Sequence, residues 1–136
     1  MKAPKIIQIP EKMEKYYGSG NMLHPELSMV EELVDLIPRG SVATLDTLTK
    51  ELANRYGTNV TCPMRTVNHL KRLSKADTLV PFWRVLKTDS TMLKLERYEH
   101  WATVLEKEGL RWEITRANQI KILIAENQLF RFEGAS

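Results

Sequence analysis

A helix-turn-helix pattern across residues 40–86 constrains this chain more than any other feature of its sequence. Apolar residues recur at helical spacing over residues 45–56, and Thr44 stands where a helix cap is expected. Gly57 and the polar residues after it end this segment. A second segment starts at Pro63, where a missing N–H costs little because the first turn of a helix leaves that donor unpaired. The sequence therefore predicts two helices joined by a short turn.

The second of these helices divides into an apolar and a polar face on a 3.6-residue wheel. The predicted apolar face consists of Met64, Val67, Leu70 and Leu73. The polar face, a sector roughly 100° wide, consists of Arg65, Asn68, His69 and Arg72. No acidic residue lies between Thr61 and Ala76, whereas Lys71 and Lys75 add positive charge.

This polar face has two interpretations. Arginine can hold a phosphate or a guanine edge and asparagine can pair with adenine, which is how the second helix of a helix-turn-helix protein reads DNA. The alternative is a solvated surface face, because short turns between helices are common in all-α proteins. Under the first interpretation the DNA-binding residues are Arg65, Asn68, His69, Arg72 and Lys75.

The whole chain has 136 residues, which is enough for one domain with a real core. Its 43% apolar and 27% charged residues are typical of a globular protein. A net charge of +3 permits a polyanionic partner without demanding one. With Cys62 as the single cysteine, no intramolecular disulfide can form. No apolar run approaches the length of a membrane span. We therefore expect a cytoplasmic monomer with no membrane contact and no cofactor.

The segments before the helix pair predict an arm and one more helix. Residues 1–24 are rich in proline, glycine and mixed charge, which predicts a loosely held N-terminal arm with a turn of helix at residues 11–17. The domain proper is expected over residues 25–136. Residues 28–37 predict a helix that opens with a capping box of Ser28 and Glu31.

The segments after the helix pair predict a loop, a helix and a small sheet. Residues 79–86 are expected to form an ordered loop leading into a short strand, because Pro81 has no ladder donor. Helical spacing then covers residues 95–107, and alternation over 111–115 and 119–124 predicts two antiparallel strands. The expected fold is mainly α with a small antiparallel β element, in a winged helix-turn-helix arrangement.

Four segments resemble, in order and spacing, the DNA-binding domain of alkylguanine-DNA alkyltransferases (the methylated-DNA-cysteine methyltransferase family) and of the alkyltransferase-like proteins. Residues 37–44, Ile-Pro-Arg-Gly-Ser-Val-Ala-Thr, resemble the opening of that domain. Residues 64–67, Met-Arg-Thr-Val, resemble the start of its recognition helix, where the resemblance implies that Arg65 enters the duplex in place of a flipped base. Residues 81–85, Pro-Phe-Trp-Arg-Val, stand at its Pro-Cys-His-Arg-Val active-site motif, and residues 105–109 resemble its Leu-Leu-x-x-Glu-Gly.

The departures from the family motifs imply a protein that does not transfer alkyl groups. Alkyl transfer needs a thiolate activated by a base. Phe82 stands at the place of the cysteine, and Trp83, whose indole only donates, stands at the place of the histidine. Glu108 keeps the position of the glutamate that supports that histidine, and Leu45 replaces a tyrosine that helps to rotate the target phosphate. The degenerate motif therefore consists of Pro81, Phe82, Trp83, Arg84 and Glu108.

The roles of these residues are left with alternatives. We favour Phe82 as a filler of the former alkyl pocket, while Trp83 either fills the pocket or stacks on a nucleobase. Arg84 is expected to hold its loop through backbone carbonyls. Cys62 is expected to be a small apolar residue that lets the turn close. The three histidines show no metal-ligand spacing with Cys62, so no zinc site is expected.

Two functions from different classes follow from the sequence. The first is a non-enzymatic DNA-binding protein of alkyltransferase-like type, with double-stranded DNA that carries an alkylated guanine as its implied ligand and a repair protein as an implied partner. The second is a protein-interaction or regulatory domain that keeps the fold without lesion binding. Leu45 and Phe82 favour the second, whereas the basic residues of the second helix favour the first.

Overall fold

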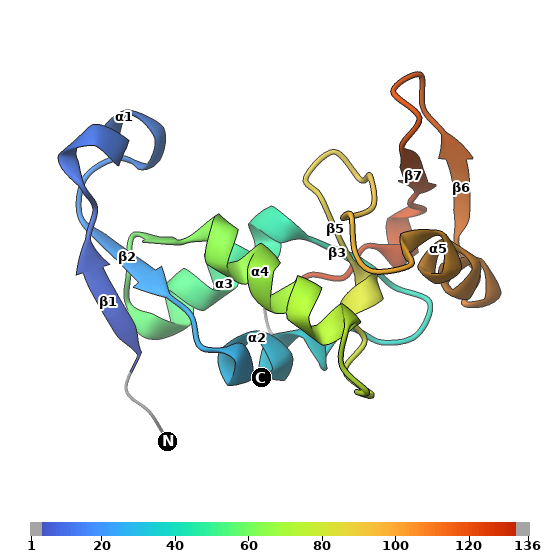
Figure 1. Ribbon diagram of the computed structural model, residues 1–136, viewed down its shortest axis with the longest axis horizontal. Coiled ribbons are helices and arrows are strands. Elements are labelled where there is room, and N and C mark those ends of the chain that lie inside the picture. Colours follow the sequence, from blue (N-terminus) through green and yellow to red (C-terminus); the bar gives the residue numbers. More distant parts are fainter. Residues whose placement is uncertain (1–3, 133–136) are drawn as a thin grey trace.

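The computed structural model describes residues 4–132, which form helices and three small sheets (Figure 1). The helices are α1 (Glu14–Tyr17), α2 (Leu27–Val34), α3 (Leu45–Tyr56), α4 (Pro63–Ser74) and α5 (Tyr98–Lys107), with 3-10 turns η1 (Glu11–Met13), η2 (Phe82–Arg84) and η3 (Glu126–Gln128). The strands are β1 (Lys5–Gln8), β2 (Asn21–His24), β3 (Ala43–Thr44), β4 (Val60–Thr61), β5 (Val85–Leu86), β6 (Arg111–Ile114) and β7 (Ile120–Leu123).

The predicted helix pair is confirmed as α3 and α4. Gly57 adopts a left-handed backbone (φ 68°) that ends α3, a conformation that glycine adopts without a steric penalty. Pro63 is the first residue of α4, as expected. The buried face of α4 consists of Thr66, Leu70 and Leu73. The prediction that Met64 belongs to this face is wrong, because its side chain is 71% exposed.

The core has two clusters, and Phe82 of the η2 turn belongs to the first of them. The first cluster lies between α2, α3 and α4 and includes Leu33, Leu48, Leu70 and Phe82. The second lies between α5 and the β6–β7 hairpin. The side chains of Trp83 and Trp101 pack against both clusters. These two aromatic residues therefore join the two halves of the molecule.

The N-terminal arm is a firmly attached hairpin and not the loosely held segment expected from its composition. Strand β1 pairs antiparallel with β2, and β2 pairs parallel with β4 at the start of α4. Ile9, Met22 and Leu23 of this arm are at most 2% exposed. The expected short helix at residues 11–17 is present as η1 followed by α1. Buried apolar residues thus outweigh the proline and glycine residues that suggested a loose arm.

Helix α2 is confirmed, but its predicted cap is not. The helix starts at Leu27, with Glu26 at the cap position and no side-chain capping bond, so Ser28 and Glu31 form no capping box. The expected apolar residues of this helix, including Ile37 just beyond its end, are nearly inaccessible to solvent. Packing of this stripe into the first cluster therefore defines the position of the helix.

The C-terminal half follows the predicted order with a later helix start. Helix α5 begins at Tyr98 and not at 95, because Arg97 takes a left-handed conformation (φ 55°) that does not continue a helix. Strands β6 and β7 form the predicted antiparallel pair, with Trp112 opposite Ile122. In Figure 1 this hairpin projects from one end of the molecule and the N-terminal hairpin from the other. Within residues 4–132, no helix combines the length and the hydropathy required to span a bilayer.

A matched pair of leucines tests the placement of the core. Leu48 of α3 is fully buried, whereas Leu79 is 96% exposed. We expect Leu48→Ala to lower the free energy of unfolding by roughly 2–5 kcal/mol, because it leaves a cavity. Leu79→Ala should change it by less than about 0.5 kcal/mol. Urea denaturation followed by circular dichroism measures both values, and equal losses would contradict the described core.

Candidate nucleic-acid interface

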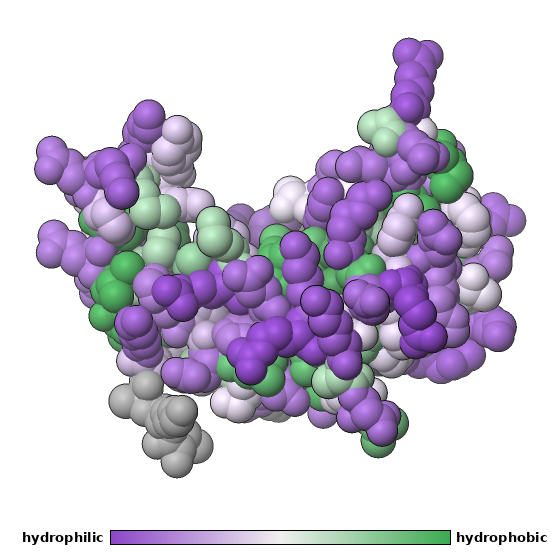
Figure 2. All heavy atoms as spheres, viewed as in Figure 1, coloured by the Kyte–Doolittle hydropathy of each residue, from purple (hydrophilic) through white to green (hydrophobic). Residues whose placement is uncertain are grey.

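The exposed face of α4 is a continuous basic stripe. Its members follow one another at intervals of one or three residues, so they lie along one side of the helix. They are Met64, Arg65, Asn68, Lys71, Arg72 and Lys75, all exposed. In Figure 2 hydrophilic side chains cover much of the face that α4 crosses. The predicted DNA-binding residues Arg65, Asn68, Arg72 and Lys75 are thus brought together on one surface.

The four cations of this stripe are available to a ligand. No carboxylate among residues 4–132 forms an ion pair with Arg65, Lys71, Arg72 or Lys75. The helix itself contributes no acidic residue. Such an uncompensated row of positive charges favours a polyanion along the helix.

His69 lies apart from this stripe. Its ring is half-buried, and Nε2 is 2.7 Å from the carbonyl oxygen of Pro25. Its Nδ1 is buried and has no hydrogen-bond partner among the described residues. His69 therefore connects α4 to the segment after β2 and does not share the exposed surface with Arg65 and Arg72. On the helical wheel His69 lies at the edge of the polar sector, so the sequence of α4 alone does not determine whether it is exposed. The segment around Pro25, which follows β2, covers it.

The degenerate motif forms a packed aromatic cluster. Phe82 is 2% exposed, and its ring meets Trp83 and Trp101 edge-on at centroid distances of 5.2 and 4.7 Å. Trp83 and Trp101 stack in parallel, with centroids 4.9 Å apart and 8° between the ring planes. The side chain of Phe82 thus fills space inside the first core cluster, as its pocket-filling interpretation requires.

Trp83 is held by this cluster but is not fully enclosed. Its indole Nε1 donates a hydrogen bond of 3.2 Å to Oε2 of Glu108, and the guanidinium of Arg84 lies 5.4 Å from its ring centroid. Its side chain is half-buried. Trp101 already covers one face of the Trp83 ring. A nucleobase could stack on Trp83 only if the guanidinium of Arg84 left the other face free. The stacking interpretation stays a prediction.

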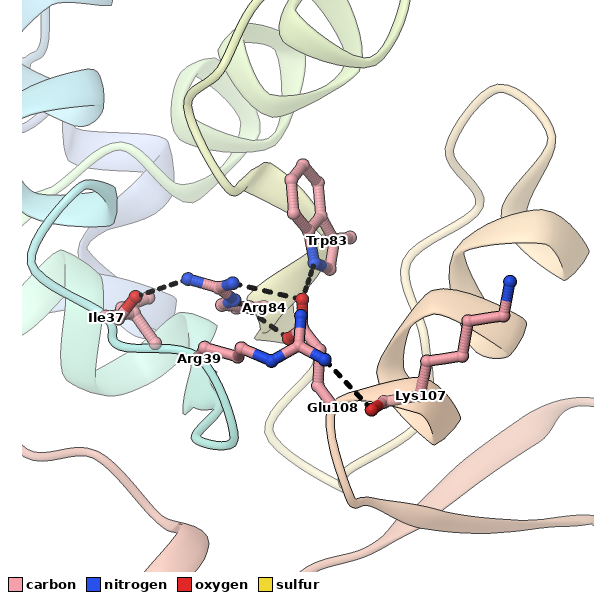
Figure 3. A network of polar contacts seen from close by, with 6 residues as sticks. All are labelled: Ile37, Arg39, Trp83, Arg84, Lys107 and Glu108. Atoms are coloured by element: carbon pink, nitrogen blue, oxygen red, sulfur yellow. Dashed lines mark hydrogen bonds and ion pairs between the residues drawn. The ribbon is translucent and has the colours of Figure 1, made fainter.

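Arg84 and Glu108 form a buried ion pair behind this cluster (Figure 3). Nε and Nη2 of Arg84 donate to the two carboxylate oxygens of Glu108 at 2.9 and 3.0 Å, and Nη1 donates to the carbonyl of Ile37 at 2.9 Å. Nearby, Arg39 donates to the carbonyl of Lys107 at 3.1 Å. The expectation that Arg84 holds its loop through a backbone carbonyl is confirmed, and the carboxylate of Glu108 is its main partner.

Cys62 occupies the cap position of α4, where its backbone N–H donates to the carbonyl of Leu23 at 2.9 Å. Its side chain is half-buried. This placement agrees with a residue that lets the turn before α4 close. Across residues 4–132, the structure contains no cluster of three or more histidine, cysteine or acidic side chains suited to a metal ion.

Sequence reasoning missed two residues next to the stripe, Lys5 and His24. They face each other across the β1–β2 pair, and His24 lies close enough to Arg65 for the arginine charge to act on its ring. Burial, and then the charges of Arg65 and Lys5, hold the pKa of His24 below its usual value. The interpretation of residues 1–24 as a loose arm hid this arrangement, which depends on strand register.

Comparison with solved structures shows that the chain has the fold of alkyltransferase-like proteins. It is similar to S. pombe Atl1, crystallised in complex with damaged DNA containing O6-carboxymethylguanine, at a TM-score of 0.61 and 24% identity. It is also similar to S. pombe ATL, crystallised in complex with DNA, at a TM-score of 0.56 and 23% identity. Each match covers 77% of this chain and 94% of the other. No family model and no curated protein matches the sequence.

The buried ion pair gives a test of the structure around the degenerate motif. We expect Glu108→Ala to lower the free energy of unfolding by roughly 3–5 kcal/mol, because it leaves the charge of Arg84 buried without a partner. The more exposed pair of Glu51 and Arg55 on α3 is the control, and Glu51→Ala should cost less than about 1 kcal/mol. Urea denaturation measures both. A loss at Glu108 no larger than the loss at Glu51 would contradict the described network.

Proposed function

We propose that this protein binds double-stranded DNA without enzymatic activity, as an alkyltransferase-like protein, and recognises damaged DNA carrying an alkylated guanine. In this proposal α3 and α4 are the helix-turn-helix and α4 enters a groove of the duplex. The β6–β7 hairpin takes the place of the wing in a winged helix-turn-helix. We further propose a cytoplasmic monomer that passes the marked site to a repair-protein partner.

The observation that carries this proposal is the unpaired basic stripe on α4. Its arginine and lysine side chains can neutralise successive phosphates, and Asn68 lies among them, where it can reach a base edge. Met64 is the one large apolar side chain exposed on this stripe. The likeness to two proteins crystallised with DNA adds support at the level of the fold.

The packing of the degenerate motif supports a binding role over catalysis. Phe82 has no nucleophilic atom, and its ring is enclosed by Trp83 and Trp101. The Nε1–H of Trp83 is already bonded to Glu108, and an indole cannot act as a general base. Recognition of a lesion would thus rest on the surface of α4 and the half-buried side chain of Trp83.

A second candidate function is protein interaction, and a groove on the α2 side favours it. The groove, of about 770 Å³, is lined by Glu26, Leu27, Met29, Glu31, Glu32 and Tyr56, among others. Its acidic and apolar lining suits a basic amphipathic segment better than DNA. This function is compatible with a repair-protein partner and does not compete for the α4 stripe.

Substitution of the stripe arginines tests the DNA-binding proposal. We expect Arg72→Ala and Arg65→Ala each to weaken duplex binding and to reduce the slope of log K against log salt by about 0.9, because one phosphate contact is lost. Fluorescence anisotropy with a labelled duplex over a range of salt concentrations measures both quantities. The control is Arg131→Ala, an exposed arginine near α3. Unchanged affinity and slope in both stripe variants would favour the protein-interaction function.

Incubation with DNA that contains O6-methylguanine tests the absence of alkyl transfer. We expect the intact mass of the protein to stay unchanged, because neither Phe82 nor Trp83 offers a thiolate or an activating base. Intact-mass spectrometry after prolonged incubation gives the answer. A stoichiometric gain of one methyl group would contradict the proposal, and peptide mapping would then show whether Cys62 is the acceptor.

A further inference from the structure

Two hydrogen bonds connect the end of the N-terminal hairpin to α4, one at the cap of the helix and one in its second turn. The N–H of Cys62 donates to the carbonyl of Leu23, and the ring of His69 bonds the carbonyl of Pro25. Strand β2 also pairs with β4, which directly precedes the helix. Figure 1 shows the hairpin beside the beginning of α4. Side chains on this part of the hairpin therefore keep a fixed position relative to the basic stripe.

Lys5 and His24 point to the same side of the hairpin. They are directly opposed in the antiparallel pair, so their side chains share one face of it. Leu23, the neighbour of His24, points to the other face and lies in the first core cluster. Lys5 is exposed and His24 is half-exposed, whereas Met22 further along the same face is buried. The end of this face that carries Lys5 and His24 is therefore the part that solvent reaches.

Arg65 completes a group of three basic side chains at this junction. Its charge and that of Lys5 are the charged groups that act on the His24 ring, and both are positive. Glu26, two residues further along the chain, lines the separate groove on the α2 side. Nδ1 of His24 is buried without a partner, and no hydrogen bond to its Nε2 is formed within residues 4–132. The ring is thus unpaired beside two cations that have no carboxylate partner.

We propose that Lys5, His24 and Arg65 form a seat for a backbone phosphate, so that the N-terminal hairpin extends the DNA-binding surface beyond α4. This inference rests on the proposed function. A phosphate here would compensate the positive charges of Lys5 and Arg65, which both act on the His24 ring. It would also accept a hydrogen bond from Nε2–H of His24, which needs no proton uptake when the ring is neutral. The hairpin would then fix the register of the duplex at the beginning of α4.

Two lysines of the same hairpin give a matched test. We expect Lys5→Ala to lower duplex affinity severalfold and to reduce the salt slope by about 0.9, as one lost phosphate contact requires. Lys12, in η1 at the other end of the hairpin, is the control, and Lys12→Ala should leave both quantities nearly unchanged. Equal effects of the two variants would overturn the seat while leaving the proposed function intact, provided that Arg72→Ala still weakens binding.

The ring of His24 reports on the seat independently. In the free protein its pKa lies below the usual value, and a bound phosphate should raise it, because the anion favours the protonated ring. Duplex affinity should then increase as the pH falls from the pKa of His24 in the complex to its pKa in the free protein. The total increase should be about tenfold for each unit by which binding raises that pKa. NMR titration of the histidine rings with and without duplex measures the pKa, with His24→Gln for assignment and the exposed His100 as reference.

The outcomes separate the two proposals. A raised pKa of His24 in the complex, and a flatter pH dependence of binding in His24→Gln, support the seat. An unchanged or lowered pKa of His24 in a protein that binds duplex overturns it. If the wild-type protein binds no duplex, the proposed function fails, and titration with inorganic phosphate decides the seat by the presence or absence of a shift in the His24 resonances.

Discussion

The buried ion pair of Arg84 with Glu108 holds together parts of the chain that no regular element connects. Arg84 directly follows Trp83 in the chain, and Glu108 lies at the end of α5. Arg84 also donates a hydrogen bond to the carbonyl of Ile37, which lies beyond the end of α2. The two core clusters meet at this point through Trp83 and Trp101. A buried guanidinium requires this carboxylate, because a lone charge in such a place costs several kcal/mol. The relative position of the helix pair and the C-terminal hairpin therefore depends on this contact.

The same contact holds the residues of the degenerate motif within the core. The resemblance to alkyltransferases places a cysteine and a histidine where this chain has Phe82 and Trp83. The carboxylate of Glu108 accepts hydrogen bonds from Trp83 and Arg84. The basic side of α4, by contrast, lies at the surface and is open to a ligand.

Local patterns predicted the elements that depend on nearby residues. Gly57 and Pro63 predicted the boundaries between α3 and α4, and alternation predicted β6 and β7. The failures arose where distant segments decide the outcome. Met64 is exposed because no element covers that side of α4, and His69 is withdrawn because Pro25 lies against it. The attachment of residues 5–24 depends on the pairing of β2 with β4, which composition does not reveal.

The proposed function requires that α4 presents a surface for damaged duplex DNA. The most direct test is a titration of the wild-type protein, over a range of salt concentrations, with one duplex that contains a single O6-alkylguanine and with the same duplex undamaged. We expect the protein to bind both duplexes, with log K falling linearly as the logarithm of the salt concentration rises. Binding to the damaged duplex should be tighter. If neither duplex showed salt-dependent binding, DNA binding through α4 would be contradicted. Equal affinity for the two duplexes would contradict the proposed recognition of damage.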